Sequence, residues 1–316
     1  MTTSVRRLVA VSAVILLCWD STPSAQAPAL DAVLSRVASY LHVYVPRLAR
    51  IVASEEYEQR VSVSGGSTPI VVSNGNMVSG GGPGNATDVW KLKSEVLLVR
   101  YPLGDVDWMW FRDVSEAGGK RLPHDPDRLV KLFVAPNADT AEQASRISYE
   151  SFRYNLGGAT VPATNPVLVV ALMQAGYQPR LRFKLGDTEK SLGPNVRELK
   201  FEEREETEPA PGQKKGQKLP LLLDPAGRIR GTAWVDVKTG EILKTDARIG
   251  ELRTQTTTTT TFTQDERFLL LVPKEMRTRW TYVRGGPVTG VAKYSNFRQF
   301  DVSADTPQLQ LPQAPR

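Results

Sequence analysis

A run of closely spaced β-strand signals between residues 228 and 303 constrains this chain more than any other feature. Strand-forming segments follow one another here, separated by short turns and without helical periodicity. The clearest part is Gly231–Leu243, where two β-rich runs flank the turn sequence Lys-Thr-Gly-Glu. Gly240 can adopt the positive φ that such a hairpin turn requires. The segment therefore predicts an antiparallel meander, whose further strands cover residues 252–263, 268–283 and 289–302.

Upstream of this meander the pattern mixes strands and helices. Alternation of apolar and polar residues predicts strands at residues 90–101 and 107–114 and a hairpin of residues 180–185 and 196–203. Capping residues and apolar spacing predict helices at residues 125–133, 139–155 and 167–175. We expect these helices to form an insertion, residues 125–176, in a sheet that spans residues 89–303.

The residues before this sheet divide into a leader, a helix and a loop. Arg6 and Arg7, an apolar stretch and the small residues Ala25-Gln-Ala27 predict that residues 1–27 are a secretory signal peptide. The apolar spacing within residues 28–60 predicts an N-terminal amphipathic helix that is kinked at Pro46 and continues to about Glu58. Its apolar residues recur at helical spacing: Leu30, Val33, Leu34, Val37, Leu41 and Val45. Residues 61–88 are rich in Gly and Ser and predict a flexible loop.

The predicted leader places the mature chain in the periplasm or outside the cell. Cys18 is the single cysteine, so a chain cut after Ala27 would hold no disulfide and no thiolate. Lipidation at Cys18 would need a small residue before it, where Leu17 stands. No later run approaches the ~20 apolar residues of a membrane helix, so we expect no transmembrane segment in the mature chain.

The fold class that these patterns indicate is α+β, with a curved antiparallel β-sheet that forms a half-open barrel. The helices are expected to pack on its concave or open side. Two further segments should lie outside the folded part: residues 205–218, charged and rich in Pro, predict an exposed loop, and residues 304–316 predict a disordered C-terminal tail.

The motifs of common enzyme chemistry are missing from the sequence. The two histidines, His42 and His124, lie far apart in the chain and have no cysteine partners after the leader, which argues against a metal site. There is no Gly-x-Ser-x-Gly elbow and no phosphate-binding loop. The net charge of +6 is spread along the chain rather than clustered, so a nucleic-acid partner is not expected. We predict neither enzyme activity nor a cofactor, although a hydrolase based on two carboxylates stays open, because such pairs meet only in the fold.

The aromatic and apolar residues of the predicted meander are the candidate binding residues. Residues of one parity face one side of a strand, so these side chains can line the concave face of a curled sheet. They are Leu252, Phe262, Met276, Trp280, Tyr282 and Tyr294. The set allows two interpretations, a dry core beneath the helices or a cavity that admits an acyl chain or a similar apolar ligand.

The segments Trp234-Val-Asp-Val-Lys-Thr-Gly240 and Ala292-Lys-Tyr-Ser-Asn-Phe-Arg298 resemble the C-terminal part of outer-membrane lipoprotein-sorting proteins of the LolA/LolB type. The resemblance covers about the last third of the chain and implies a LolA-like half-barrel that carries a lipid or a lipidated protein. The whole chain also resembles a group of exported bacterial proteins that bring no function with them. We therefore expect an exported, non-enzymatic carrier. The alternative is an envelope protein with a filled core that binds a protein partner.

Overall fold

The fold is described from a computed structural model of the chain. It describes residues 29–63, 70–71, 77–78, 86–103, 106–123, 125, 128–134, 140–156, 164–205, 227–250, 255–281 and 287–299. The predicted signal peptide with Cys18, the predicted loop 205–218 apart from Glu205, and the predicted tail 304–316 lie outside these residues, as do Leu252, Tyr282 and His124.

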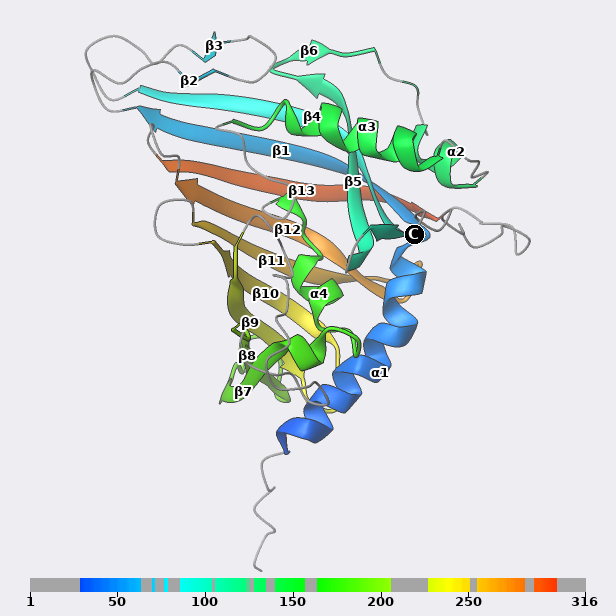
Figure 1. The fold of residues 1–316 in the computed structure, drawn as a ribbon, viewed down its shortest axis with the longest axis vertical. Coiled ribbons are helices and arrows are strands. Elements are labelled where there is room, and N and C mark those ends of the chain that lie inside the picture. Colours follow the sequence, from blue (N-terminus) through cyan, green and yellow to red (C-terminus); the bar gives the residue numbers. More distant parts are fainter. Residues whose placement is uncertain are drawn as a thin grey trace, which may run out of the picture.

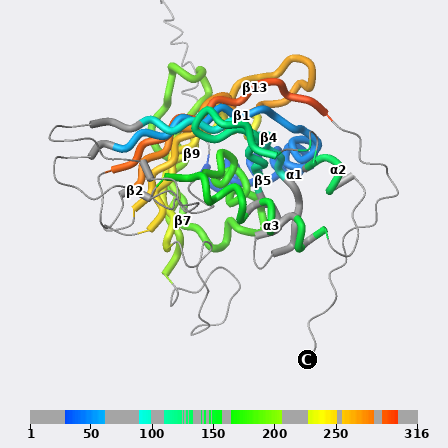
Figure 2. Tube along the Cα trace, turned by 90° about the horizontal axis from the view of Figure 1, so that it is seen from above, coloured from blue at the N-terminus to red at the C-terminus, as the bar shows by residue number. Residues whose placement is uncertain are grey.

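One open antiparallel sheet of eleven strands dominates the molecule (Figure 1). Its spatial order is β6-β5-β4-β1-β13-β12-β11-β10-β9-β8-β7, and its two end strands are not paired with each other. Seen from above, β4, β1 and β13 run along one side while β9 and β7 turn away from them, so that the sheet is bent but not closed (Figure 2). The strands are β1 (Ile51–Val63), β4 (Ala86–Leu103), β5 (Val106–Ala117), β6 (Lys120–Arg121), β7 (Leu181–Thr188), β8 (Val196–Glu203), β9 (Ile229–Asp236), β10 (Ile242–Ile249), β11 (Thr256–Asp265), β12 (Leu270–Thr281) and β13 (Pro287–Gln299).

The predicted C-terminal meander is confirmed, because β9 to β13 pair in sequence order. The turn between β9 and β10 contains Gly240 at φ +85°, as the sequence indicates. A second constraint acts on this glycine, since a Cβ there would lie 2.5 Å from the carbonyl oxygen of Arg36. The turn therefore packs directly against the N-terminal helix, and only glycine fits both the backbone conformation and the contact.

The prediction for residues 28–60 is half wrong. The helix α1 (Leu30–Leu48) includes Pro46 and ends two residues later, and residues from Ile51 onward form β1. This strand pairs with β13 on one side and β4 on the other, so that it is central to the sheet. Hydrogen bonds from two partner strands outweigh the helical spacing of Leu48, Ile51 and Val52. The loop predicted for residues 61–88 also contains the small hairpin β2 (Ile70–Val71) and β3 (Met77–Val78).

Most buried apolar side chains belong to one core on the face that we call the inner face, which carries Ala53, Tyr57, Met276 and Ala292. Helix α1 also runs past the β11–β12 turn, where Tyr44 Oη donates to Leu271 O at 2.7 Å and Arg47 Nη2 donates to Phe268 O at 2.6 Å. The short helix α4 (Leu168–Leu172) crosses in front of the sheet, and all five of its residues are buried (Figure 1).

The other two helices, α2 (Arg128–Val134) and α3 (Thr140–Phe152), lie at the β4–β5 end (Figure 1). Val52, Leu97 and Phe111 stand side by side in the register and face away from the main core. They form a second cluster with Ile147 of α3. The expectation that all helices cover the inner side is therefore corrected, because apolar residues on the opposite, outer face also require cover.

Candidate functional site

The inner face holds a buried ion pair at its β1–β5 end. Arg112 Nε donates to Glu55 Oε2 at 2.5 Å and Arg112 Nη2 donates to Glu55 Oε1 at 2.8 Å. The two side chains are 4% and 0% exposed, so neither charge is solvated. Burial acts to lower the pKa of the Arg112 guanidinium, but the charge and hydrogen bonds of Glu55 outweigh it and raise the pKa above its ordinary value. The guanidinium of Arg112 therefore stays charged inside the core.

Tyrosines surround this ion pair. The guanidinium of Arg112 lies 5.1 Å from the centre of the Tyr57 ring, and Tyr57 Oη is 2.9 Å from Thr278 Oγ1. The ring of Tyr294 meets Trp110 edge to face at 5.9 Å. Burial raises the pKa of both phenols well above its usual range, so both are neutral at physiological pH. We call Glu55, Arg112, Tyr57 and Tyr294 the inner polar cluster.

A short segment that is not part of the sheet is held against this face. The side chain of Gln59 makes two hydrogen bonds with the backbone of this segment. Leu156 N donates to Gln59 Oε1 at 2.8 Å, and Gln59 Nε2 donates to Tyr154 O at 3.4 Å. Trp90 Nε1 donates to Tyr154 O at 3.1 Å, and Trp280 Nε1 donates to Leu156 O at 3.2 Å. We call Tyr154–Leu156 the seated segment, because sheet side chains bind its backbone as they would bind a peptide ligand.

Two further hydrogen bonds join the seated segment and the preceding helix, α3, to Arg112 on β5. Asn155 Oδ1 accepts a long hydrogen bond from Arg112 Nη1 at 3.5 Å, which joins the segment to the inner polar cluster. Ser151, near the end of α3, donates through its hydroxyl to the backbone carbonyl of Arg112. These contacts place the seated segment over β1 and β12 rather than at the rim of the sheet.

Three buried donors on the inner face have no hydrogen-bond partner within the described part of the chain, and one of them is Thr260 Oγ1, on β11 opposite Met276. The other two are Trp110 Nε1 and Ser94 Oγ, at the β4–β5 end, on side chains that are 8% and 4% exposed. Ser94 stands directly opposite Glu55 in the β1–β4 register, and Trp110 packs on Tyr294. Buried donors are normally satisfied, so each marks a position at which a ligand acceptor could bind.

The structure brings together three of the residues that the sequence indicated. Met276, Trp280 and Tyr294 are all buried on the inner face, and Tyr294 Oη lies 3.9 Å from Met276 Sδ. Phe262 is partly buried and packs against the edge of the same core. Leu252 and Tyr282 lie outside the described residues.

The polar half of the site was missed by sequence reasoning. Glu55, Tyr57 and Gln59 lie on β1, in the region expected to be helical, and Arg112 lies on β5. The available signal was the alternation of residues 51, 53, 55, 57, 59 and 61, all of which are buried. Two of these six are polar, which hides the pattern from an analysis based on apolar residues alone.

Other chemistry receives little support from the described residues. They contain no cluster of three metal-ligating side chains, and His42 lies exposed on α1. A small hollow of about 220 Å³ contains the carboxylates of Asp113 and Glu150, the kind of pair that a hydrolase would need. Arg128 forms ion pairs with both carboxylates, with Asp113 Oδ2 at 3.4 Å and with Glu150 Oε2 at 3.0 Å, and so links them to each other. No helix among these residues is both long and apolar enough to cross a membrane.

Comparison with known proteins gives matches among solved structures only. No family model and no curated protein matches the chain. A LolA superfamily protein from Nitrosomonas europaea is similar with a TM-score of 0.29 and 10% identity, over 87% of this chain and 95% of that one. A domain from Vibrio parahaemolyticus, assigned provisionally to outer membrane lipoprotein sorting, gives a TM-score of 0.26 and 13% identity, over 84% and 94%. These TM-scores are too low to place the chain in that superfamily.

Proposed function

We propose that this chain is an exported, non-enzymatic carrier that binds an acyl chain or a lipidated segment on the inner face of its sheet. The observation that carries the proposal is the seated segment. Gln59, Trp90 and Trp280 direct their side-chain polar groups at the backbone of a segment that belongs to no strand. In this interpretation the structure is the closed form, in which the chain occupies its own binding site.

The chemistry of the site suits an apolar ligand with a polar end. Helix α4 covers the inner face with five consecutive apolar residues, Leu168–Leu172. An acyl chain that replaced them would recover a similar gain, roughly 25 cal/mol for each Å² of apolar surface removed from water. Trp110 Nε1 and Ser94 Oγ, which have no partner among the residues that the structure describes, can bind a carboxylate or ester oxygen, which the apolar helix cannot supply.

A second candidate function has an observation of its own in its favour. Met276, Trp280 and Tyr294 are buried by other parts of the same chain. If the seated segment and α4 never leave, the inner face is an ordinary core and the chain acts through its outer surfaces on a protein partner. The two candidates therefore differ in one property, whether this cover can be displaced by a ligand.

Native mass spectrometry of the mature protein, purified without detergent from a periplasmic expression host, tests this property first. A carrier should retain a lipid that organic extraction identifies, or take up added fatty acid or phospholipid. A clean apo mass with no uptake would contradict the carrier proposal and favour the filled core.

A pair of tryptophan variants then locates the ligand. Trp280→Phe keeps the ring packing but removes the hydrogen bond to Leu156 O, so it should loosen the seated segment. One hydrogen bond is worth about 1 kcal/mol, so a fluorescent fatty acid should bind about fivefold more tightly. The matched control is Trp234→Phe, because Trp234 lies on the outer face, where it packs under Lys244 Nζ at 4.3 Å. Equal affinities in the two variants would place the ligand elsewhere.

A further inference from the structure

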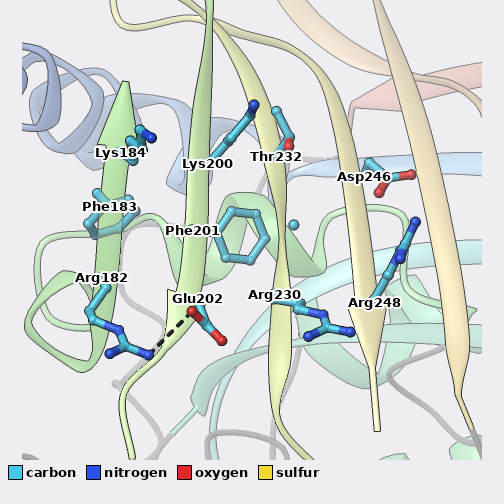
Figure 3. A pocket seen from close by; sticks show the side chains of 11 residues that line it. Arg182, Phe183, Lys184, Lys200, Phe201, Glu202, Arg230, Thr232, Asp246 and Arg248 are labelled. Atoms are coloured by element: carbon cyan, nitrogen blue, oxygen red, sulfur yellow. Dashed lines mark hydrogen bonds and ion pairs between the residues drawn. The ribbon is translucent and has the colours of Figure 1, made fainter. Parts of the chain in front are cut away.

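The outer face of β7–β10 has an open hollow with an unusual charge. Its volume is about 520 Å³, and five cations line it: Arg182, Lys184, Lys200, Arg230 and Arg248. The carboxylates of its lining are Glu202 and Asp246, so five positive charges less two negative charges leave an excess of three. Figure 3 shows Lys184 and Lys200 toward one end of the hollow and the three arginines toward the other. We call this site the outer hollow.

Strand alternation explains its shape. Phe183, Phe201 and Gly231 also line the hollow, but each stands between two outer-face residues of its strand, so its side-chain direction is toward the inner face. The floor is therefore the main chain of these middle residues, and the walls are long charged side chains. Gly231 cannot be replaced there without a clash, since a Cβ would lie 2.9 Å from Phe201 Cζ and closer still to Asp246 O.

The strand register places like charges directly opposite each other twice. Lys184 pairs with Lys200 across β7 and β8, and Arg230 pairs with Arg248 across β9 and β10. Like charges in directly opposite positions of an antiparallel pair destabilise a sheet. The register thus concentrates positive charge at two neighbouring points, at some cost to folding.

Partners within the chain neutralise only part of this charge. Arg182 contacts Glu202 at 3.2 Å, and Lys200 contacts Glu198 at 3.0 Å. Asp246 accepts a hydrogen bond from Thr259 at 2.8 Å. In contrast, no hydrogen bond or ion pair joins Lys184, Arg230 or Arg248 to another described side chain, and all three are exposed.

The other end of the same outer face behaves differently. Glu58 stands opposite Lys91 and lies 3.5 Å from its Nζ, and Lys93 stands opposite Glu116 at 3.2 Å. The pairs Glu58–Lys91 and Lys93–Glu116 thus join opposite charges across β1, β4 and β5. Across β7–β10 the register is mixed, because Glu202 stands opposite both Arg182 and Arg230, whereas the Lys184–Lys200 and Arg230–Arg248 pairs join like charges. The like pair at that end, Glu95 opposite Asp113, is anionic, and Arg298 and Arg128 pair with its two carboxylates. The two pairs of cations are therefore specific to the outer hollow.

We propose that the outer hollow binds a ligand with two phosphate groups on one small scaffold. One phosphate lies between Lys184 and Lys200, and the other lies between Arg230 and Arg248, whose forked donors suit phosphate oxygens. The two pairs are two strands and two residues apart, which separates their backbone centres by about 12 Å. Long side chains can shorten that span to fit a sugar or glycerol bisphosphate. The same chemistry occurs in soluble bisphosphates and in diphosphorylated lipid headgroups.

Titration calorimetry with fructose 1,6-bisphosphate and with inorganic phosphate tests the soluble source, and flotation with phosphatidylcholine vesicles, with and without cardiolipin, tests the lipid source. The bisphosphate or the cardiolipin vesicles should bind, and inorganic phosphate should bind at least tenfold more weakly than the bisphosphate, because it reaches only one pair. Binding by neither bisphosphate source would overturn the proposal. Binding of inorganic phosphate as tight as that of the bisphosphate would also contradict it.

The double variant Arg230→Gln/Arg248→Gln locates the ligand. It should weaken binding of the productive probe at least tenfold, because it removes two charge-assisted contacts. The matched control is Arg277→Gln, an exposed outer-face arginine that is paired with Glu275 at 2.7 Å, and its binding should stay within twofold of the unmodified protein. Because removing Arg230 and Arg248 relieves repulsion, the double variant should melt no lower than the unmodified protein. Equal losses in the two variants would contradict a site in the outer hollow.

Discussion

The inner polar cluster and the outer hollow treat charge in opposite ways. Inside, Glu55 and Arg112 are removed from water and bound to each other through two hydrogen bonds. Outside, Arg230 and Arg248 stand opposite each other, exposed and without an ion-pair partner among the described residues. An unpaired charge in the core costs several kcal/mol, whereas water screens charges at the surface. The interior therefore requires complementarity, while the surface can keep unbalanced charge available for a ligand.

The largest effect should come from breaking the inner pair. Glu55→Leu leaves the Arg112 guanidinium buried and still charged, because arginine does not lose its proton in proteins. The free energy of unfolding should fall by about 3–5 kcal/mol. Urea denaturation measures it, with Glu58→Leu as control, since Glu58 pairs with the exposed cations Arg60 and Lys91 at the surface, where an ion pair is worth about 0–1 kcal/mol.

A double variant sharpens the same comparison. Glu55→Leu/Arg112→Met removes both charges, so it should recover much of the stability lost by Glu55→Leu alone. If the single and double variants lose the same amount, the buried charge of Arg112 is not the cause of the loss.

A smaller loss of stability is expected from Gln59→Met. This variant tests the hydrogen bonds of the seated segment while leaving the Glu55–Arg112 ion pair in place. The variant leaves Leu156 N–H buried without its acceptor, and this should cost about 1–3 kcal/mol. Hydrogen exchange at the Leu156 amide should speed up more than exchange in the central strands. Gln264→Met is the control, because Gln264 is exposed on β11 and should change stability by less than about 0.5 kcal/mol. Uniformly faster exchange would mean that Gln59 stabilises the whole fold and not this segment.

The smallest effect belongs to the outer face, where two mirror-image variants test the charge pattern. Lys184→Glu turns a like pair into an opposite pair and should stabilise the fold by about 0.2–1 kcal/mol. Glu116→Lys does the reverse opposite Lys93 and should destabilise it by a similar amount. Thermal melting at low salt measures both shifts, and both should shrink at 1 M salt as screening increases. Shifts of the same sign would show that cross-strand charge does not control stability on this face.

Local sequence was sufficient where alternation and turn residues agree. The five strands β9 to β13 follow the predicted meander, and the hairpin at Gly240 forms where its turn residues indicate. It was insufficient for β1, because Leu48, Ile51 and Val52 also fit a helix and because Glu55 and Gln59 occupy buried positions. Residues from Ile51 onward form a strand and not a helix because β4 and β13 supply hydrogen bonds on both sides of β1.

The candidate site divides in the same way. Met276, Trp280 and Tyr294 could be proposed from parity alone, since strand alternation fixes which side chains share a face. Their partners could not be proposed. Arg112 meets Glu55 at a separation of 57 residues, and Trp280 meets Leu156 at 124, and no local pattern encodes such contacts.

By itself the sequence determined where most strands and turns form, because backbone propensity and side-chain alternation act over a few neighbouring residues. Only the tertiary structure decided how they are used. It inserted β1 between β4 and β13, placed the seated segment on the inner face, and set the register that puts Lys184 opposite Lys200 and Arg230 opposite Arg248. Register and burial depend on hydrogen bonds and packing between residues that are distant in the chain, and so they emerge only when the whole sheet assembles.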